Sequence, residues 1–450
     1  MEFDAATQEL YAGTNGGVSY LPLEGSRLRY LGGSTNHWGG WCRPLDEIDF
    51  EPRSWIPNSG WPIKRTELAP YFARAQALVE AGPFIYDEEK KWTEAFRQPV
   101  LRLAPGGVYT SWFQFSKTRD SVLPTHFGER YAEDLKRHPR LQLYSYANVT
   151  GLRLSADANR MDHLDVATLS GNRFRVEPKV TVLATGAMEN ARLLLASNDV
   201  MTTGVGNGYD MVGRFFADHP IPRGAATLVV FNGRLAPFYL DFQNADGAVV
   251  RATFSPRPDF QREKNVLGSL TTVDNSIDLD EVGNQAVRAV ASALRIDASA
   301  ARAFSLGCGM ELVPDPHRRL SLTHTRDPLG MPRLHLSMTV SDSDFMHYRL
   351  TLAELGRQLL GAGLGMIRLD RKRRDEWLEV LDWGNHHMGT TRMSDEPHSG
   401  VVDPNLKVHG ISNLFVTGSS TFPTYGSSNP TLNLVALTLR LADHLRGHFR

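Results

Sequence analysis

The sequence predicts an α/β protein, α+β overall, on three observations along its 450 residues. A short apolar strand at 180–184 runs through a Thr-Gly pair directly into a helix at 189–197. Segments on both sides of this unit show the alternating apolar and polar residues that are typical of strands. The chain then closes with a strand at 413–418 and a helix at 430–446. Strand–helix units beside runs of strands indicate a layered sheet and a second group of strands.

Length and composition set the broad class. A chain of this length can bury a large core and is expected to form two domains. Its 49 basic and 50 acidic residues nearly cancel, so nothing indicates an electrostatic affinity for nucleic acid or for anionic lipid. Of the two cysteines, Cys42 and Cys308, two free buried thiols are favoured over one disulfide. Without a membrane-length apolar run or a leader-like start, the chain as given is expected to be soluble and cytoplasmic.

Residues 1–178 mix irregular and regular segments. Residues 1–62 are rich in glycine, proline, asparagine, serine and tryptophan, and an irregular stretch of this length is usually functional. A helix is predicted at 66–80 with Thr66 as its N-cap, and another at 128–139, ended by Pro139. Strands are predicted next at 141–154, 163–169 and 172–178.

The strand–glycine–helix unit around Gly186 has a chemical consequence. Backbone N–H groups and the positive end of the helix point to whatever lies above the sheet edge. The sequence therefore predicts a phosphate-binding position at this join.

A second region covers residues 222–381. Its predicted strands lie at 225–231, 318–324 and 332–340. Helices are predicted around 284–303 and from Ser341, a plausible N-cap, to about Gly361.

The motif "HHMGTTRM" at 386–393 places two adjacent histidines before a turn-forming glycine. By default, such a histidine is a structural residue in a core. A metal site would need these histidines, with His398 or His409, to converge with Asp395 or Asp403, and no standard ligand spacing is present. The third interpretation is an acid or base, because the imidazole pKa lies near neutral pH.

Three segments together resemble the glucose–methanol–choline (GMC) family of flavin oxidoreductases. They are "GGSTNHWGG" (32–40), "VTVLATGAMENARLLLAS" (180–197) and the block from "HHMGTTRM" to the closing helix. Within the family, the motif of the carboxyl-terminal block is most similar to those of the gluconate- and fructose-dehydrogenase-like and pyranose-oxidase-like members. The resemblance implies an incomplete FAD-binding Rossmann-like domain and a discontinuous second domain of antiparallel sheet plus helices. The implied ranges are 1–62, 140–221 and 382–450 for FAD binding, and 63–139 and 222–381 for the substrate or cap domain.

The resemblance also implies residue roles. A histidine at the position of His386 lies over the flavin and takes the proton of a substrate hydroxyl, while hydride leaves for flavin N5. Asn429 stands where the family has His or Asn, and its side chain can hydrogen-bond the developing alkoxide. Since Asn429 precedes Pro430, it also fits a simple cap of the last helix. His387 is expected to be structural or a packing partner.

"GGSTNHWGG" is expected to contact the cofactor. Gly32 and Gly33 allow close backbone approach, while Ser34, Thr35 and Asn36 offer hydrogen-bonding groups. In pyranose-oxidase-like members, the histidine of this pattern is bonded to the flavin, and His37 matches that position. Covalent and noncovalent binding both stay open, as does a glycine-rich loop with His37 packed beneath it.

The remaining cofactor contacts follow from the same resemblance. The isoalloxazine is expected between residues 32–40 and residues 417–431. The further candidate contacts are Val149, Ala184 and Gly186 at the adenosine end, and Gly418, Pro430 and Thr431 at the carboxyl-terminal side. The segment "VGRFFADHP" (212–220) also recurs in the family and is expected to be structural, without a chemical role.

The sequence departs from the family in one large respect. Members open with a strand, a G-x-G-x-x-G turn and a helix that holds the FAD pyrophosphate, and no segment here matches that pattern. A mis-assigned start, a split protein and a decayed gene each explain this, and the first is favoured. The chain by itself is accordingly expected to bind FAD poorly and to aggregate.

The function predicted from the resemblance is FAD-dependent oxidation of a CH–OH group in a sugar, polyol or related alcohol. The alternative is a non-catalytic remnant or interaction subunit that holds no flavin. The expected partners are the small alcohol or sugar and, as electron acceptor, a protein or a quinone; no metal is expected. A periplasmic location is compatible if a leader precedes the chain.

Overall fold

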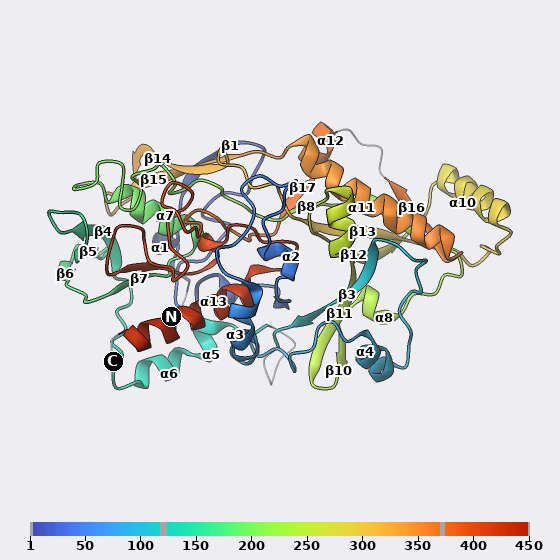
Figure 1. Ribbon diagram of the computed structural model, residues 1–450, viewed down its shortest axis with the longest axis horizontal. Coiled ribbons are helices and arrows are strands. Elements are labelled where there is room, and N and C mark those ends of the chain that lie inside the picture. The colour runs from blue at the N-terminus through green and yellow to red at the C-terminus, as the bar shows by residue number, and fades with distance from the viewer. Residues whose placement is uncertain (1–2, 118–123, 370–373, 449–450) are drawn as a thin grey trace.

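The computed structural model describes residues 3–117, 124–369 and 374–448. Its largest sheet has eight strands, all paired antiparallel, in the order β16-β9-β13-β12-β11-β3-β2, with β10 on β11. The strands are β2 Trp41–Cys42, β3 Val108–Phe115, β9 Ala226–Val230, β10 Gln243–Ala245, β11 Ala248–Pro256, β12 Ser269–Ile277, β13 Arg302–Met310 and β16 Gly365–Leu369. Helix α11, Asp342–Gly361, packs on this sheet at the right of Figure 1.

The strand–glycine–helix unit forms as the sequence predicts. Strand β7, Thr181–Leu183, pairs in parallel with β18, Leu414–Val416, and helix α7, Ala187–Ala196, begins directly after Gly186. The chain closes with α13, Pro430–His448, at the lower left of Figure 1. The sheet edge formed by β7 and β18 thus ends beside the first turn of α7.

Two three-stranded sheets and a strand pair complete the β structure. Strand β1, Gly13–Gly17, runs parallel to β15, Pro332–Met338, which pairs with β14, Arg319–Arg326. The other sheet contains β4 Asn148–Leu154, β5 Met161–Ala167 and β6 Arg173–Val176. The pair joins β8, Pro220–Pro222, to β17, Leu381–Trp383.

Strand β14 lies against α7 and far from the main sheet (Figure 1). Arg192 of α7 reaches this sheet, donating to the Pro332 carbonyl at 2.8 Å and to the Asp327 carboxylate at 2.8 Å. Residues 319–338 therefore stand beside the strand–glycine–helix unit.

Helix ends agree with the predictions where a local cap determines them. Ser341 caps α11: its hydroxyl accepts from the Asp344 N–H, and the Asp344 carboxylate accepts from the Ser341 N–H. Thr66 is not an N-cap; α3, Arg65–Leu78, starts after Lys64, and Glu67 accepts from the Lys64 N–H. The sequence pattern favours Thr66 because threonine is a commoner N-cap than lysine.

The helix predicted at 128–139 is two short ones, α5 Phe127–Arg130 and α6 Ala132–Arg137. The helix predicted around 284–303 is α10, Glu281–Leu294, which ends at the left-handed Arg295 (φ 55°). The remaining helices are α1 Ala5–Glu9, α2 Glu47–Phe50, α4 Glu89–Phe96, α8 Pro237–Leu240, α9 Pro258–Lys264 and α12 Arg374–Glu379, with 3-10 turns η1 Gly33–Asn36 and η2 Ser419–Thr421.

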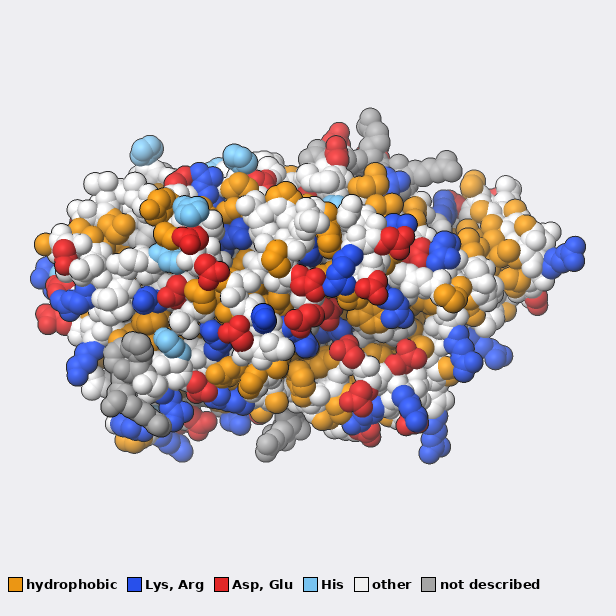
Figure 2. All heavy atoms as spheres, viewed as in Figure 1, with side chains coloured by type: hydrophobic (Ala, Val, Ile, Leu, Met, Phe, Trp, Pro, Cys, Tyr) orange, Lys and Arg blue, Asp and Glu red, His pale blue; other side chains and the backbone are white. Residues whose placement is uncertain are grey.

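Three general expectations concern the core and the surface. Cys42 and Cys308 are both free and buried, as predicted. Basic and acidic side chains are interspersed over the face shown in Figure 2, consistent with the near-zero net charge. Within residues 3–117, 124–369 and 374–448, no helix has the length and apolar character needed to cross a bilayer.

Candidate active site

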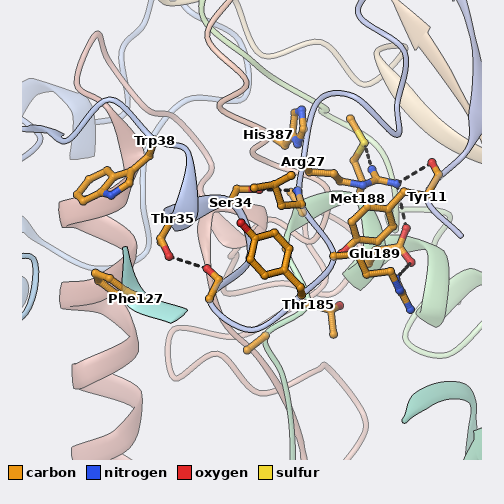
Figure 3. A pocket seen from close by; sticks show the side chains of 18 of the residues that line it. Tyr11, Arg27, Ser34, Thr35, Trp38, Phe127, Thr185, Met188, Glu189 and His387 are labelled. Carbon is orange, nitrogen blue, oxygen red and sulfur yellow. Dashed lines mark hydrogen bonds and ion pairs between the residues drawn. The ribbon is translucent and has the colours of Figure 1, made fainter. Parts of the chain in front are cut away.

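A cavity of about 900 Å³ opens between the N-terminal loop, the start of α7 and the carboxyl-terminal block. This volume lies at the upper end of the range for small-molecule sites. Eleven of the predicted site residues line it: Gly32, Gly33, Ser34, His37, Val149, Ala184, Gly186, His386, Asn429, Pro430 and Thr431. Figure 3 shows this cavity with Arg27, Glu189 and His387 on one side and Trp38 and Phe127 on the other. Segments far apart in the sequence therefore meet around one space.

His386 sits on a short segment that pairs with residues 217–219. Ala217 and Met388 exchange backbone hydrogen bonds of 3.1 and 2.9 Å, and the Gly384 N–H donates to the His219 carbonyl at 2.9 Å. This antiparallel bridge fixes the backbone on both sides of His386. The imidazole is then held at the cavity wall by the chain and not by a flexible loop.

Both ring nitrogens of His386 have partners. Nδ1 lies 2.8 Å from Nδ1 of His219, and Nε2 lies 3.1 Å from the side-chain nitrogen of Asn429. Nε2 of His219 lies 2.9 Å from the Gly426 carbonyl oxygen. The Asn429 side chain is thus directed to His386, which excludes the interpretation of that residue as a helix cap alone.

Asp218 holds the two histidine segments together. Its Oδ1 accepts from the backbone N–H of His219 at 2.7 Å and from that of His386 at 2.8 Å. The hydroxyl of Tyr20 donates to its Oδ2. Because Asp218 is fully buried, its pKa is raised to about 7 despite these donors.

Burial also lowers the pKa values of the three neighbouring histidines. The pKa of His386 is lowered well below its usual value by desolvation, and the neighbouring His219 and His387 lower it further. Burial lowers the pKa of His219 to about 4 and that of His387 to about 3. All three imidazoles are therefore neutral at neutral pH, which is the state that a base requires.

His387 points between aromatic rings. Its ring centroid lies 5.8 Å from that of Phe216 and 6.3 Å from that of Tyr20. Its backbone carbonyl accepts from the Ser419 hydroxyl at 2.7 Å. Its Nε2 is buried without a hydrogen-bond partner, although the residue lines the cavity. This buried, unpaired nitrogen is one feature that a bound group would complete.

In the loop at 32–36, some side chains line the cavity and others form hydrogen bonds within the protein. Ser34 accepts from the Leu28 N–H at 3.2 Å, and Thr35 donates to the Gly32 carbonyl. Asn36 does not line the cavity; it donates to the Leu31 carbonyl at 2.7 Å and accepts from the Gly128 N–H. Its predicted cofactor contact is replaced by a contact that joins the loop to α5.

Gly32, which lines the cavity, is also required by protein packing. A Cβ on Gly32 would lie 2.3 Å from the Gly128 nitrogen, and its φ is +92°. His37 lines the cavity next to Trp38, whose Nε1 donates to the Thr125 carbonyl at 3.0 Å. Burial and the nearby His126 lower the pKa of His37. The neutral His37 ring therefore faces the space that a cofactor would occupy.

The start of α7 forms the other end of the cavity. Gly186 has a φ of +85°, and a Cβ placed there would meet nothing within 4 Å, so backbone faces open space. In the first turn, Glu189 is held by Arg27 at 3.1 Å, by Arg29 at 3.4 Å and by Arg192 at 3.4 Å (Figure 3). The open backbone at the helix start suits an anionic group, while the basic cluster of Arg27, Arg29 and Arg192 is paired with Glu189.

Gly418 does not line the cavity, since it precedes η2 with its carbonyl accepting from Thr421. Ser419, one residue later, does line it. Among the described residues, no group of three or more His, Cys, Asp or Glu side chains is placed to hold a metal ion.

Sequence reasoning missed Asp218 and His219. Both lie in "VGRFFADHP" (212–220), which was expected to be structural only. The available signal is an adjacent acid and imidazole, Asp218 and His219, after the apolar residues 215–217. Their pairing with His386, 167 positions away in the sequence, was not visible from spacing.

The chain is similar to several known proteins. Residues 314–438 match the family model described as GMC oxidoreductase. The fructose dehydrogenase large subunit of Gluconobacter japonicus is 26% identical over 66% of this chain and 52% of its own length. The chain thus spans about half of that relative. The 6'''-hydroxyparomomycin C oxidase of Streptomyces lividus is 25% identical over 93% of this chain and 79% of its own length.

Solved structures show the same fold. Pyridoxine 4-oxidase superposes with a TM-score of 0.51 and 19% identity, over 91% of this chain and 72% of its own. A formate oxidase variant of Aspergillus oryzae superposes with a TM-score of 0.57 and 16% identity, over 98% and 90%. In its matched family model, in these relatives and in this fold, the chain is similar to the GMC oxidoreductases.

Proposed function

We propose that this protein is an FAD-dependent oxidoreductase that oxidises the CH–OH group of a sugar, polyol or related alcohol. One observation carries the proposal: Nε2 of His386 and the side-chain nitrogen of Asn429 lie 3.1 Å apart at the wall of the cavity. A neutral imidazole nitrogen next to an amide N–H suits one hydroxyl, since the first accepts its proton and the second donates to its oxygen.

The residues present fit a dinucleotide flavin in three ways. The cavity is large, the backbone at Gly186 faces open space, and Nε2 of His387 is buried without a partner. Arg29 of the basic cluster lines the same space and is positioned to accompany an anionic group. FAD, when bound, accepts the electron pair that leaves the substrate carbon as hydride.

The chain's own residues do the rest. His386 takes the hydroxyl proton at Nε2, and Asn429 holds the oxygen so that the C–H bond faces into the cavity. The low pKa of His386 keeps it unprotonated before the reaction. Burial of His219 and Asp218 behind it excludes water from the non-reacting side of the ring.

The names of the relatives support a sugar-like substrate, but they do not identify one kind of electron acceptor. They are named as a fructose dehydrogenase large subunit, a 6'''-hydroxyparomomycin C oxidase and a C-glycoside 3-oxidase of Microbacterium trichothecenolyticum, the last 28% identical over 92% of this chain. We infer a polyhydroxylated substrate of similar chemistry. The electrons then pass to oxygen, a quinone or an acceptor protein.

The test follows flavin absorbance during anaerobic mixing of the FAD-loaded protein with a panel of sugars and polyols. One of them is expected to bleach the flavin, and His386→Ala should slow bleaching by roughly 10²- to 10⁴-fold. His398→Ala, on an exposed histidine, is the matched control. Near-normal bleaching in His386→Ala would remove the proposed base. A protein that takes up no flavin would favour the non-catalytic alternative.

The same preparation decides how FAD is attached. Flavin that stays with the acid-precipitated wild-type chain, but is released from His37→Ala, would establish a bond through His37. Release from both proteins would establish noncovalent binding.

A further inference from the structure

His219 is a buried partner of the His386 ring. It is 2% exposed, its ring lies nearly perpendicular to that of His386 at 5.1 Å, and Tyr425 packs on it at 5.0 Å. The two Nδ1 atoms are 2.8 Å apart, so one of them must carry a proton and the other a lone pair.

The proton positions on both rings can be assigned by starting from the Gly426 carbonyl, which ends this chain of hydrogen bonds. The Gly426 carbonyl only accepts, so Nε2 of His219, 2.9 Å away, carries the proton of that neutral ring. Nδ1 of His219 therefore carries the lone pair. Nδ1 of His386 must then donate to it, which leaves Nε2 of His386 unprotonated.

Asn429 agrees with this assignment independently. Its side-chain nitrogen, a donor, faces Nε2 of His386 at 3.1 Å. Gly426 and Asn429 belong to one loop, three positions apart, so the hydrogen bonds form a closed circuit from the loop through both rings and back. Glu311 steadies the same loop by accepting from the Gly426 N–H.

We propose that His219 is a positioning residue that fixes His386 in its Nδ1–H tautomer and so keeps Nε2, beside Asn429 at the cavity wall, unprotonated. This inference rests on the proposed function for its catalytic meaning. The orienting group is a neutral imidazole and not a carboxylate. The carboxylate of Asp218 accepts instead from the backbone N–H groups of both histidines.

The first measurement needs no turnover. Protein labelled with ¹⁵N in histidine is examined by long-range ¹H–¹⁵N correlation, with His386 and His219 signals assigned from single-site variants. Wild-type His386 is expected to show a protonated Nδ1 and a bare Nε2, and His219 the opposite. A bare Nδ1 on His386 would overturn the proposal.

Two substitutions at His219 then separate positioning from packing. In His219→Asn, the amide oxygen stands close to the former Nδ1 and can still accept from His386. In His219→Leu, the space is filled but no acceptor remains. His386 should keep its Nδ1–H tautomer in the asparagine variant and lose it in the leucine variant. An unchanged tautomer in His219→Leu would overturn the proposal; if that variant does not fold, the wild-type spectrum and His219→Asn decide.

Flavin reduction supplies a second, separable readout. His219→Leu is expected to lower the maximal rate of reduction on the order of 10- to 100-fold, as when the hydrogen-bonded orienter of an imidazole is removed. The apparent substrate affinity should change little, and His219→Asn should recover most of the rate. If His386→Ala stays active, the proposed function fails while the tautomer result stands. If His386→Ala is inactive but the tautomer of His386 is unchanged by substitution of His219, the inference alone fails.

Discussion

Arg53 and Glu311 form an ion pair in which neither side chain has any exposed surface. Their two hydrogen bonds measure 2.9 and 2.6 Å and join positions 258 apart in the sequence. Glu311 also accepts from the Gly268 N–H at 3.1 Å and from the N–H of Gly426. The pair therefore ties the amino-terminal region to β13 and to the loop that carries Asn429.

Breaking this pair should destabilise the whole protein. Glu311→Gln leaves the Arg53 guanidinium buried and uncompensated, which typically costs about 3–5 kcal/mol of unfolding free energy. The free energy is measured by urea unfolding. Asp382→Asn, which removes the exposed partner of Arg223, is the control and should cost about 1 kcal/mol or less. An equal loss of unfolding free energy in the two variants would contradict the larger contribution of the buried pair to stability.

The pH dependence of flavin reduction should reflect the lowered pKa of His386. A base is active when unprotonated, so the rate falls only when the pH drops through the pKa of His386 in the protein. Burial places that pKa well below the usual value of 6.5, and the rate should stay level through pH 6.5 into more acidic buffer. Stopped-flow reduction across this range tests it, and a decline centred at or above 6.5 would contradict it.

Asp218 should give the protein an unusual dependence of stability on pH. Its folded-state pKa, about 7, lies above the usual 3.8, so its contribution is complete below pH 3.8 and is lost as the pH rises through 7. Asp218→Asn removes this loss. The difference in unfolding free energy between variant and wild type should therefore move in favour of the variant from pH 4 to 7. A difference that is constant with pH would contradict the buried carboxyl as its source.

Asn429 should affect the reaction more than substrate binding. Asn429→Ala removes the donor beside Nε2 of His386 and should lower the maximal rate of flavin reduction roughly 10²- to 10³-fold. Asn429→Asp places a carboxylate there, which should raise the pKa of His386 and shift the acidic decline in rate to higher pH. Asn405→Ala, on the exposed surface, is the control. A change confined to substrate affinity would contradict the assigned role.

Local signals predicted local structure well. Gly186 and the apolar residues around it predicted β7 and α7, and Ser341 predicted the start of α11. The helix predicted at 128–139 failed because a continuous pattern of helix-forming residues does not reveal an interruption at Tyr131. The sequence also does not reveal that Gly32 packs against Gly128, a neighbour brought close only by the fold.

The candidate site follows the same division: residues in local motifs can be picked out from the sequence, and residues brought close only by the fold cannot. His386 and Asn429 lie in glycine-rich motifs that stand out from the chain, and the structure brings them within 3.1 Å. His219 stands in a segment whose partner lies 167 positions away. Such pairings depend on chain topology, and neither spacing nor composition encodes them directly.

The hydrogen-bond circuit through His386 joins positions separated by 207, 167 and 43 residues. Closing loops of such length is slow compared with forming helices and hairpins. During refolding from denaturant, far-ultraviolet circular dichroism should recover ahead of enzymatic turnover. The interval between the two signals would time the final assembly of a centre that no single segment can build alone.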